Sequence, residues 1–175
     1  MKTITILFCT VIAAVLSIFS SCTNSTATER TSTRVTKYPA PVAHQAIGGC
    51  DDKLWNFVYN PKRLNVLDKC KTVTGVIVER NADPDGDEHM LLKLDAGQEK
   101  LLEKRNYTKK EGNLVIEAVC INHITRKTAK GICKGYINNV KLPNVGDHVR
   151  VTGSYVLDTH NGWTEIHPIS KIVAF

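Results

Sequence analysis

Residues 145–153 read Val-Gly-Asp-His-Val-Arg-Val-Thr-Gly, and the pattern of this stretch indicates the fold class. Its apolar residues alternate, so that Val149, Val151, Gly153 and Tyr155 share one face of an extended chain. Alternation of period two is typical of a strand with one buried face. We therefore expect a strand over residues 145–158.

Four other segments have the composition of strands, and a short helix is expected before them. The predicted strands cover residues 71–80, 89–95, 113–120 and 163–173. Residues 81–87, Asn-Ala-Asp-Pro-Asp-Gly-Asp, are a strong turn signal between the first two. The helix should follow Asp51 and end at Asn60-Pro61. About 25 residues between the third and fourth strands leave room for another short helix.

The order of these elements is that of the OB-fold, a five-stranded Greek-key barrel. A meander of three strands, a longer connection and a final hairpin give this order. Residues 145–153 also resemble the fourth-strand signature G-D-x-V-x-V-x-G of such barrels. Residues 73–77 resemble a first strand that carries a glycine where the barrel bends tightly. The expected fold is a mainly all-β OB-type barrel with a short N-terminal helix.

Five motifs resemble a more specific family, the small exported bacterial OB-type domains of uncharacterised function. The resemblance covers roughly residues 50–175 and brings no activity with it. The motifs are Trp55…Asn60-Pro61-x-Arg63-Leu64, Cys70-x-x-Val73-Thr74-Gly75, Asp85-Gly86-Asp87-x-His89, Glu117-x-x-Cys120 and Gly162-Trp163-x-Glu165-Ile166-His167-Pro168.

The N-terminus reads as an export signal over residues 1–21. A short basic start precedes the apolar residues 4–19, and Ser20-Ser21-Cys22 resembles a bacterial lipoprotein box. The resemblance implies that Cys22 becomes the lipidated N-terminus, which would place the protein in the bacterial cell envelope, on the periplasmic or surface side of a membrane. An ordinary cleaved signal and an uncleaved anchor helix are the alternatives.

Residues 22–48 are predicted to be a flexible tether between the lipid and a domain over residues 49–175. Threonine and serine dominate the first part, and Pro39 and Pro41 follow. Such a composition buries little apolar surface.

Composition excludes some classes of protein. Apolar residues make up 42% of the 175 residues, which argues against wholesale disorder and against a polytopic membrane protein. The 23 Lys and Arg exceed the 17 Asp and Glu by six, a mild bias towards anionic partners.

Four cysteines remain in the predicted domain, and export places them in an oxidising compartment. Four cysteines allow three pairings. Cys50–Cys70 and Cys120–Cys133 are favoured, because each pair is close in sequence and brackets one connection. A four-thiolate zinc site is disfavoured, since the chain has no C-x-x-C pair.

Ionisable residues gather at two predicted hairpins, whose tips frame the ligand groove in OB barrels. At the first hairpin, a carboxylate and imidazole set suggests a divalent metal: Asp85, Asp87 and His89. At the last, an indole beside acids and bases suggests a stacking platform for a sugar or base: Asp158, His160, Trp163, Glu165 and His167.

Structural interpretations of the same residues stay open. The Asp-rich turn needs no function, Trp163 could close the end of the barrel, and His167 could be a hydrogen-bonded structural histidine. Glu117, alone in an apolar strand, could pair with Arg150 or Lys93.

Three functions are compatible with these features. The favoured one is a binding module for an unknown small ligand or glycan, with a peptide also possible and nucleic acid disfavoured because aromatics are not interleaved with the lysines. The second is a metal-dependent phosphodiesterase. Asp85-Gly86-Asp87 is similar to the D-G-D turn of staphylococcal-type nucleases, but their following carboxylates and arginine are missing from that place. The third is a structural lipoprotein that docks on another envelope protein.

Overall fold

The computed structural model describes residues 49–175. The predicted signal peptide, Cys22 and the tether lie outside this part of the chain. Within residues 49–175, no helix combines the length and the apolar character needed to cross a bilayer.

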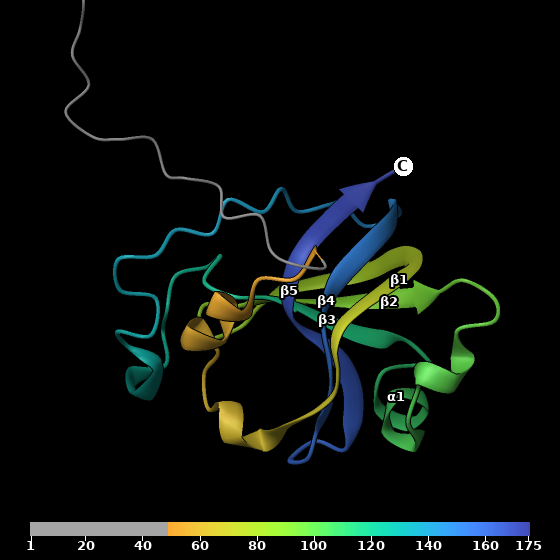
Figure 1. Cartoon of the computed structure of the whole chain (residues 1–175), viewed down its shortest axis with the longest axis horizontal. Coiled ribbons are helices and arrows are strands. Elements are labelled where there is room, and N and C mark those ends of the chain that lie inside the picture. The colour runs from red at the N-terminus through yellow and green to blue at the C-terminus, as the bar shows by residue number, and fades with distance from the viewer. Residues whose placement is uncertain (1–48) are drawn as a thin grey trace, which may run out of the picture. The chain divides into compact units, whose positions relative to one another are not determined.

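Five strands form the sheet of the described chain, and short helical turns and loops lie between them (Figure 1). The strands are β1 (Leu64–Ala82), β2 (Glu88–Leu94), β3 (Leu114–Ala118), β4 (His148–Asp158) and β5 (Trp163–Ala174). The helical elements are the 3-10 turns η2 (Asp52–Phe57), η3 (Pro61–Arg63), η4 (Glu99–Leu101) and η5 (Lys127–Ala129), and the α-helix α1 (Lys104–Lys109). The prediction of a mainly β chain with five strands is confirmed.

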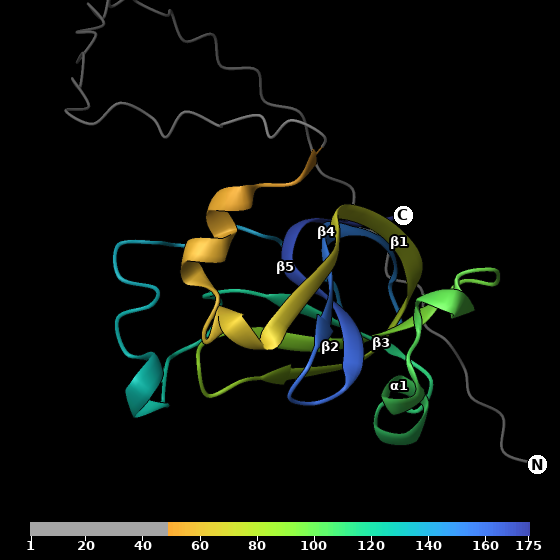
Figure 2. The same ribbon diagram turned by 60° about the horizontal axis from the view of Figure 1, so that its bottom comes forward.

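The strands are hydrogen-bonded in the order β1-β2-β3-β5-β4, and β4 pairs in turn with β1. All pairs are antiparallel except β3 with β5, which run parallel. In both views α1 lies at one side of the sheet and the long β3–β4 connection at the other (Figures 1 and 2). As a result, residues near positions 90, 117 and 165 lie side by side on three adjacent strands.

Two elements differ from the sequence-based expectation. β1 begins at Leu64 rather than near residue 71, because register shifts around Asp68 break the alternation that marks a strand. α1 was not predicted, since it has no apolar periodicity. It is held by Asn106, whose fully buried side chain caps the helix and donates to the carbonyls of Asn113 and Thr164.

The apolar core follows the predicted alternation. Val149 and Val151 of β4 are fully buried beside Met90 and Leu92 of β2 and Ile166 of β5. Because side chains alternate across a strand, the neighbours of these residues face the outer side of the sheet. The outer side of β2, β3 and β5 is where the polar residues discussed below lie.

The predicted disulfides are present. Cys50 is bonded to Cys70, and Cys120 is bonded to Cys133. The second bond ties the β3–β4 connection to the end of β3, and Tyr136 of that connection stacks on Phe57 of η2 with ring centroids 4.0 Å apart. The connection that carries Arg126 is therefore anchored beside the site.

Candidate functional site

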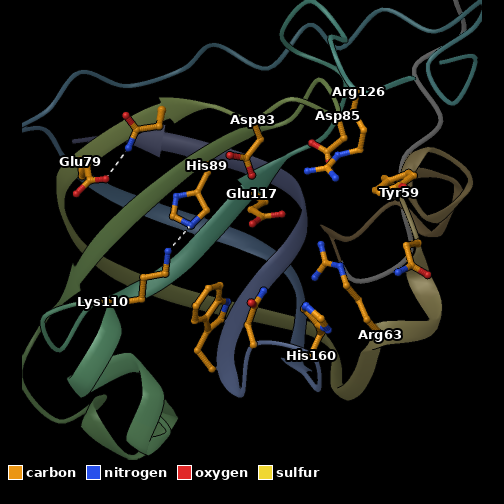
Figure 3. A pocket seen from close by; sticks show the side chains of 14 residues that line it. Tyr59, Arg63, Glu79, Asp83, Asp85, His89, Lys110, Glu117, Arg126 and His160 are labelled. Atoms are coloured by element: carbon orange, nitrogen blue, oxygen red, sulfur yellow. Dashed lines mark hydrogen bonds between the residues drawn. The ribbon is translucent and has the colours of Figure 1, made fainter. Parts of the chain in front are cut away.

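A cavity of about 560 Å³ opens between the β1–β2 and β4–β5 hairpins (Figure 3). His89 of β2 and Glu117 of β3, which are register partners, contribute to its lining. Their neighbours Met90 and Ile116 belong to the apolar core, so the cavity lies on the outer face of the sheet. The full lining is Tyr59, Asn60, Arg63, Glu79, Asn81, Asp83, Asp85, His89, Lys110, Glu117, Arg126, His160, Asn161 and Trp163.

The two hairpins that carry the predicted site residues meet at this cavity. Asp85 and His89 come from the first hairpin, and His160 and Trp163 come from the last. The expected convergence of the hairpins is therefore seen in the geometry.

The other four predicted residues lie beneath the cavity rather than in its lining. Asp87, Asp158, Glu165 and His167 are each at most 2% exposed. The metal ligands predicted from the sequence, Asp85, Asp87 and His89, do not form one cluster. Within residues 49–175, the cluster whose ligand atoms approach one another joins Asp87 to Glu117 and His167, not to Asp85 and His89.

Asp158 organises the β4–β5 hairpin. Its Oδ1 accepts hydrogen bonds from the backbone N–H groups of His160 and Asn161, and its Oδ2 accepts from the side chains of Asn161 and Arg63. Both carboxylate oxygens are occupied, so Asp158 shapes the turn and does not face a ligand.

Polar contacts run along β5 from Trp163 through Glu165 to His167. The indole Nε1 donates to Glu165 Oε2 over 2.9 Å, and His167 Nδ1 lies 3.1 Å from Glu165 Oε1. Arg63 Nη1 lies 3.5 Å from the same Oε1. The three β5 side chains thus share one face, as the alternation predicts, and the orientation of the Trp163 ring is fixed.

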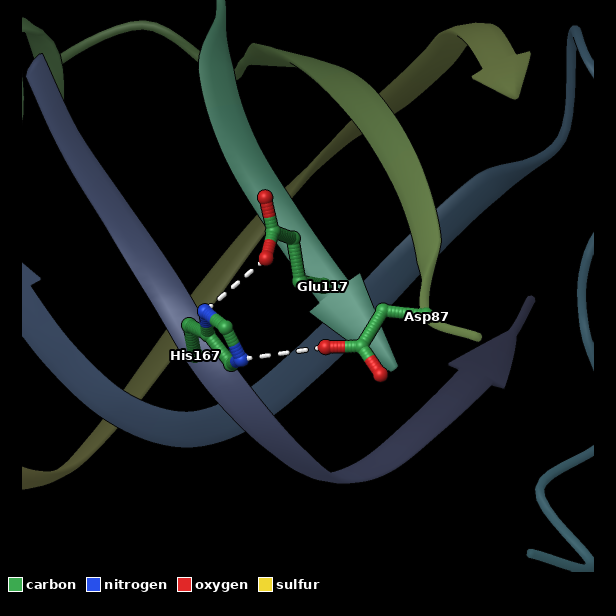
Figure 4. A group of neighbouring side chains, drawn as sticks. All are labelled: Asp87, Glu117 and His167. Carbon is green, nitrogen blue, oxygen red and sulfur yellow. Dashed lines mark ion pairs between the residues drawn. The ribbon is translucent and has the colours of Figure 1, made fainter. Parts of the chain in front are cut away.

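His167 is the centre of the buried cluster. Its Nδ1 lies 2.9 Å from Glu117 Oε2, and its Nε2 lies 3.4 Å from Asp87 Oδ2 (Figure 4). Burial alone would lower the pKa of His167, but the charge of Glu117 and the contacts with Asp87, Glu117 and Glu165 raise this pKa well above its ordinary value. His167 therefore lies among three carboxyl groups, those of Asp87, Glu117 and Glu165.

Glu117 connects the buried cluster to the cavity. It pairs with neither Arg150 nor Lys93 among the described ion pairs, and its partner is instead His167. Burial raises the pKa of Glu117 to about 7, partly offset by His167 and increased further by Glu165. A carboxyl group with this pKa can accept or donate a proton near neutral pH.

His89 and Lys110 form the opposite wall. Lys110 Nζ donates to His89 Nε2 over 3.0 Å and also lies 4.2 Å from the centroid of the Trp163 ring. Burial and then the Lys110 charge lower the pKa of His89 to about 4, so this imidazole is neutral at pH 7. A neutral ring whose Nε2 accepts from Lys110 is not free to bind a metal through that nitrogen.

The carboxylates at the tip of the first hairpin are close to one another. Burial, followed by the neighbouring carboxylates, raises the pKa of Asp83 and of Asp85. Arg126 lies nearby in the cavity lining, with its guanidinium 5.6 Å from the centroid of the Tyr59 ring.

Sequence reasoning missed several of the cavity residues. Arg63, Asp83, Lys110, Arg126 and Tyr59 lie on separate turns and loops, where no local pattern groups them. Glu117 stands out as a lone acid in an apolar strand, but no local pattern places it in the site.

The chain matches no protein-family model, and no curated protein is significantly similar to it in sequence.

Chemically, the cavity offers hydrogen-bond acceptors on an acidic floor, cations at its rim and two aromatic rings. It could hold a polar ligand through hydroxyl-to-carboxylate and charge-assisted hydrogen bonds.

Proposed function

We propose that this chain is an exported, lipid-anchored binding module of the cell envelope, built on an OB-type Greek-key barrel. This barrel type is supported by the three-strand meander, the final hairpin and the β1–β4 pairing. OB-folds bind ligands on the face of their second and third strands, between the loops that join strands 1–2 and 4–5. The cavity occupies the corresponding position. Export and anchoring at Cys22 are supported by residues 1–22.

The observation that carries the proposal is the mixed lining of this cavity. Trp163 and Tyr59 supply aromatic rings, each with a cation against it, while Asp85 and Glu117 supply acceptors. Carboxylates accept hydrogen bonds from sugar hydroxyl groups but repel a chain of phosphates. An oligosaccharide therefore fits the lining better than a nucleic acid does.

A titration with short oligosaccharides, neutral and uronic-acid-bearing, tests this function. In the Trp55→Phe variant Trp163 is the only indole, and its fluorescence should change on binding. Trp163→Ala should weaken binding about tenfold, measured by calorimetry, because the ring contact is lost. Trp55 donates to Ser154 outside the cavity, so Trp55→Phe is the matched control and should keep the affinity of the original protein. Equal affinities for Trp163→Ala and Trp55→Phe would contradict the proposal.

A second function, metal-assisted phosphodiester hydrolysis, is favoured by one specific observation. The carboxylates of Asp83, Asp85 and Glu117 and the guanidinium groups of Arg63 and Arg126 line the same cavity. Carboxylates can hold a divalent ion, and guanidinium groups can stabilise the charge that develops on a phosphodiester.

Bis(p-nitrophenyl) phosphate with Mg²⁺ or Mn²⁺ tests this second function. If it holds, the protein releases nitrophenol in a metal-dependent way, and Arg126→Met lowers the rate about 100-fold. Lys127→Met, which removes an exposed cation from the next position, should leave the rate unchanged. Absence of metal-dependent release would reject hydrolysis and leave the binding proposal standing.

A further inference from the structure

The buried cluster beneath the cavity has more negative than positive charge. Four carboxylates, those of Asp87, Glu117, Asp158 and Glu165, are each at most 5% exposed. Among the ion pairs of residues 49–175, Arg63 is the one Lys or Arg that approaches them. Four buried carboxyl groups therefore share one guanidinium, so acidic groups outnumber the Lys and Arg cations by three. Buried charge without compensation is strongly unfavourable, so the cluster requires protons or a bound cation.

His167 presents a buried nitrogen towards one of these carboxylates. Its Nδ1 is held by Glu117 and Glu165, over 2.9 and 3.1 Å. Its Nε2 is buried and has no hydrogen-bond partner in the described part of the chain, although Asp87 Oδ2 lies 3.4 Å away. With Glu165 as the supporting acid on Nδ1, Nε2 is left for an ion and Glu117 can serve as a ligand, which is the usual arrangement of a metal-binding histidine.

The separation of the donor atoms also suits a metal. Two ligands about 2.1 Å from one ion in tetrahedral geometry are about 3.4 Å apart. The measured distance from Nε2 to Asp87 Oδ2 is 3.4 Å, and one donor atom from each of Asp87, Glu117 and His167 lies within 4.8 Å of the others. One imidazole and two carboxylates form a mixed nitrogen and oxygen set, which suits Zn²⁺ or Mn²⁺ better than Mg²⁺.

We propose that Asp87, Glu117 and His167 bind one divalent transition-metal ion beneath the floor of the cavity. The ion would join the start of β2 to β3 and β5, and Glu117, which also lines the cavity, marks its route of entry. Binding displaces the proton from His167 Nε2 to solvent, because the metal takes the lone pair that holds this proton. The site does not depend on the identity of the cavity ligand.

Equilibrium dialysis of the chelator-treated full chain against Zn²⁺ tests the proposal. We expect one Zn²⁺ per chain and a rise in melting temperature on adding Zn²⁺, with a smaller response to Mg²⁺. Glu117→Gln keeps the shape of the side chain and should weaken Zn²⁺ binding at least tenfold. Its matched control is Glu111→Gln, at an exposed position, which should bind as the original protein does.

Two histidine variants and an X-ray absorption spectrum complete the test. His167→Gln should abolish Zn²⁺ binding, whereas His123→Gln, at an exposed histidine, should not. If His167→Gln does not fold, X-ray absorption of the Zn²⁺-loaded original protein decides. One imidazole nitrogen with carboxylate oxygens would support the site, and sulfur or several imidazoles would overturn it. Equal Zn²⁺ binding by the original protein and Glu117→Gln would also overturn it.

Discussion

Replacing Arg63 by methionine should lower the free energy of unfolding by about 4 kcal/mol, since removal of one partner from a buried ion pair typically costs 3–5 kcal/mol. The Arg63 side chain is 18% exposed, and those of Asp158 and Glu165, which it contacts, are at most 1% exposed. Methionine fills a similar volume but leaves both carboxylates without their cation. Equilibrium unfolding in urea, in the presence of a chelator, measures the loss.

Lys71→Met is the matched control for this prediction. Lys71 pairs with Asp68 on the surface, where the two side chains are 37% and 41% exposed. An exposed pair contributes about 1 kcal/mol or less, so this variant should be nearly as stable as the original protein. Similar losses for Arg63→Met and Lys71→Met would show that the buried cluster does not need its guanidinium.

Gly153→Ala should cost about 3 kcal/mol, the upper part of the usual range for overpacking. Gly153 pairs with Lys71 of β1 and with Ile169 of β5. A Cβ atom there would clash with the carbonyl oxygen of Pro168 and would lie 2.7 Å from Ile166 Cγ2. The first contact is with backbone, so β4 and β5 must move apart. Thermal or urea unfolding measures the effect.

Gly146→Ala separates this steric effect from the strain of a left-handed residue. Nothing lies within 4 Å of a Cβ added to Gly146, but its φ of +95° is unfavourable for alanine. This variant should lose only about 1 kcal/mol. An equal or larger loss for Gly146→Ala would contradict the close β4–β5 approach at Gly153.

Much of the fold could be predicted because its signals are local. The alternation in β4, the Asp-Pro-Asp-Gly-Asp turn and the two cysteine pairs each involve residues close in sequence. The start of β1 and the helix α1 could not be predicted in this way. Register shifts interrupt the first, and the second depends on Asn106 reaching the backbone of Thr164, 58 residues away.

The candidate site was predicted only in part, for a similar reason. The two hairpins were expected to meet, and residues of both line the same cavity. The partners of each side chain were not predictable. The sequence places Asp87 beside His89, whereas the ion-pair partner of Asp87 is His167 and His89 contacts Lys110.

Local patterns in the sequence predict the strands, the turns, the favoured disulfide pairs and the residues of unusual chemistry. Which of these residues face one another depends on the pairing of strands that are distant in sequence. Asp87, Glu117 and His167 meet because β2 pairs with β3 and β3 pairs in parallel with β5. That register is set by burial of the whole apolar face of the sheet, and no short stretch of sequence encodes it.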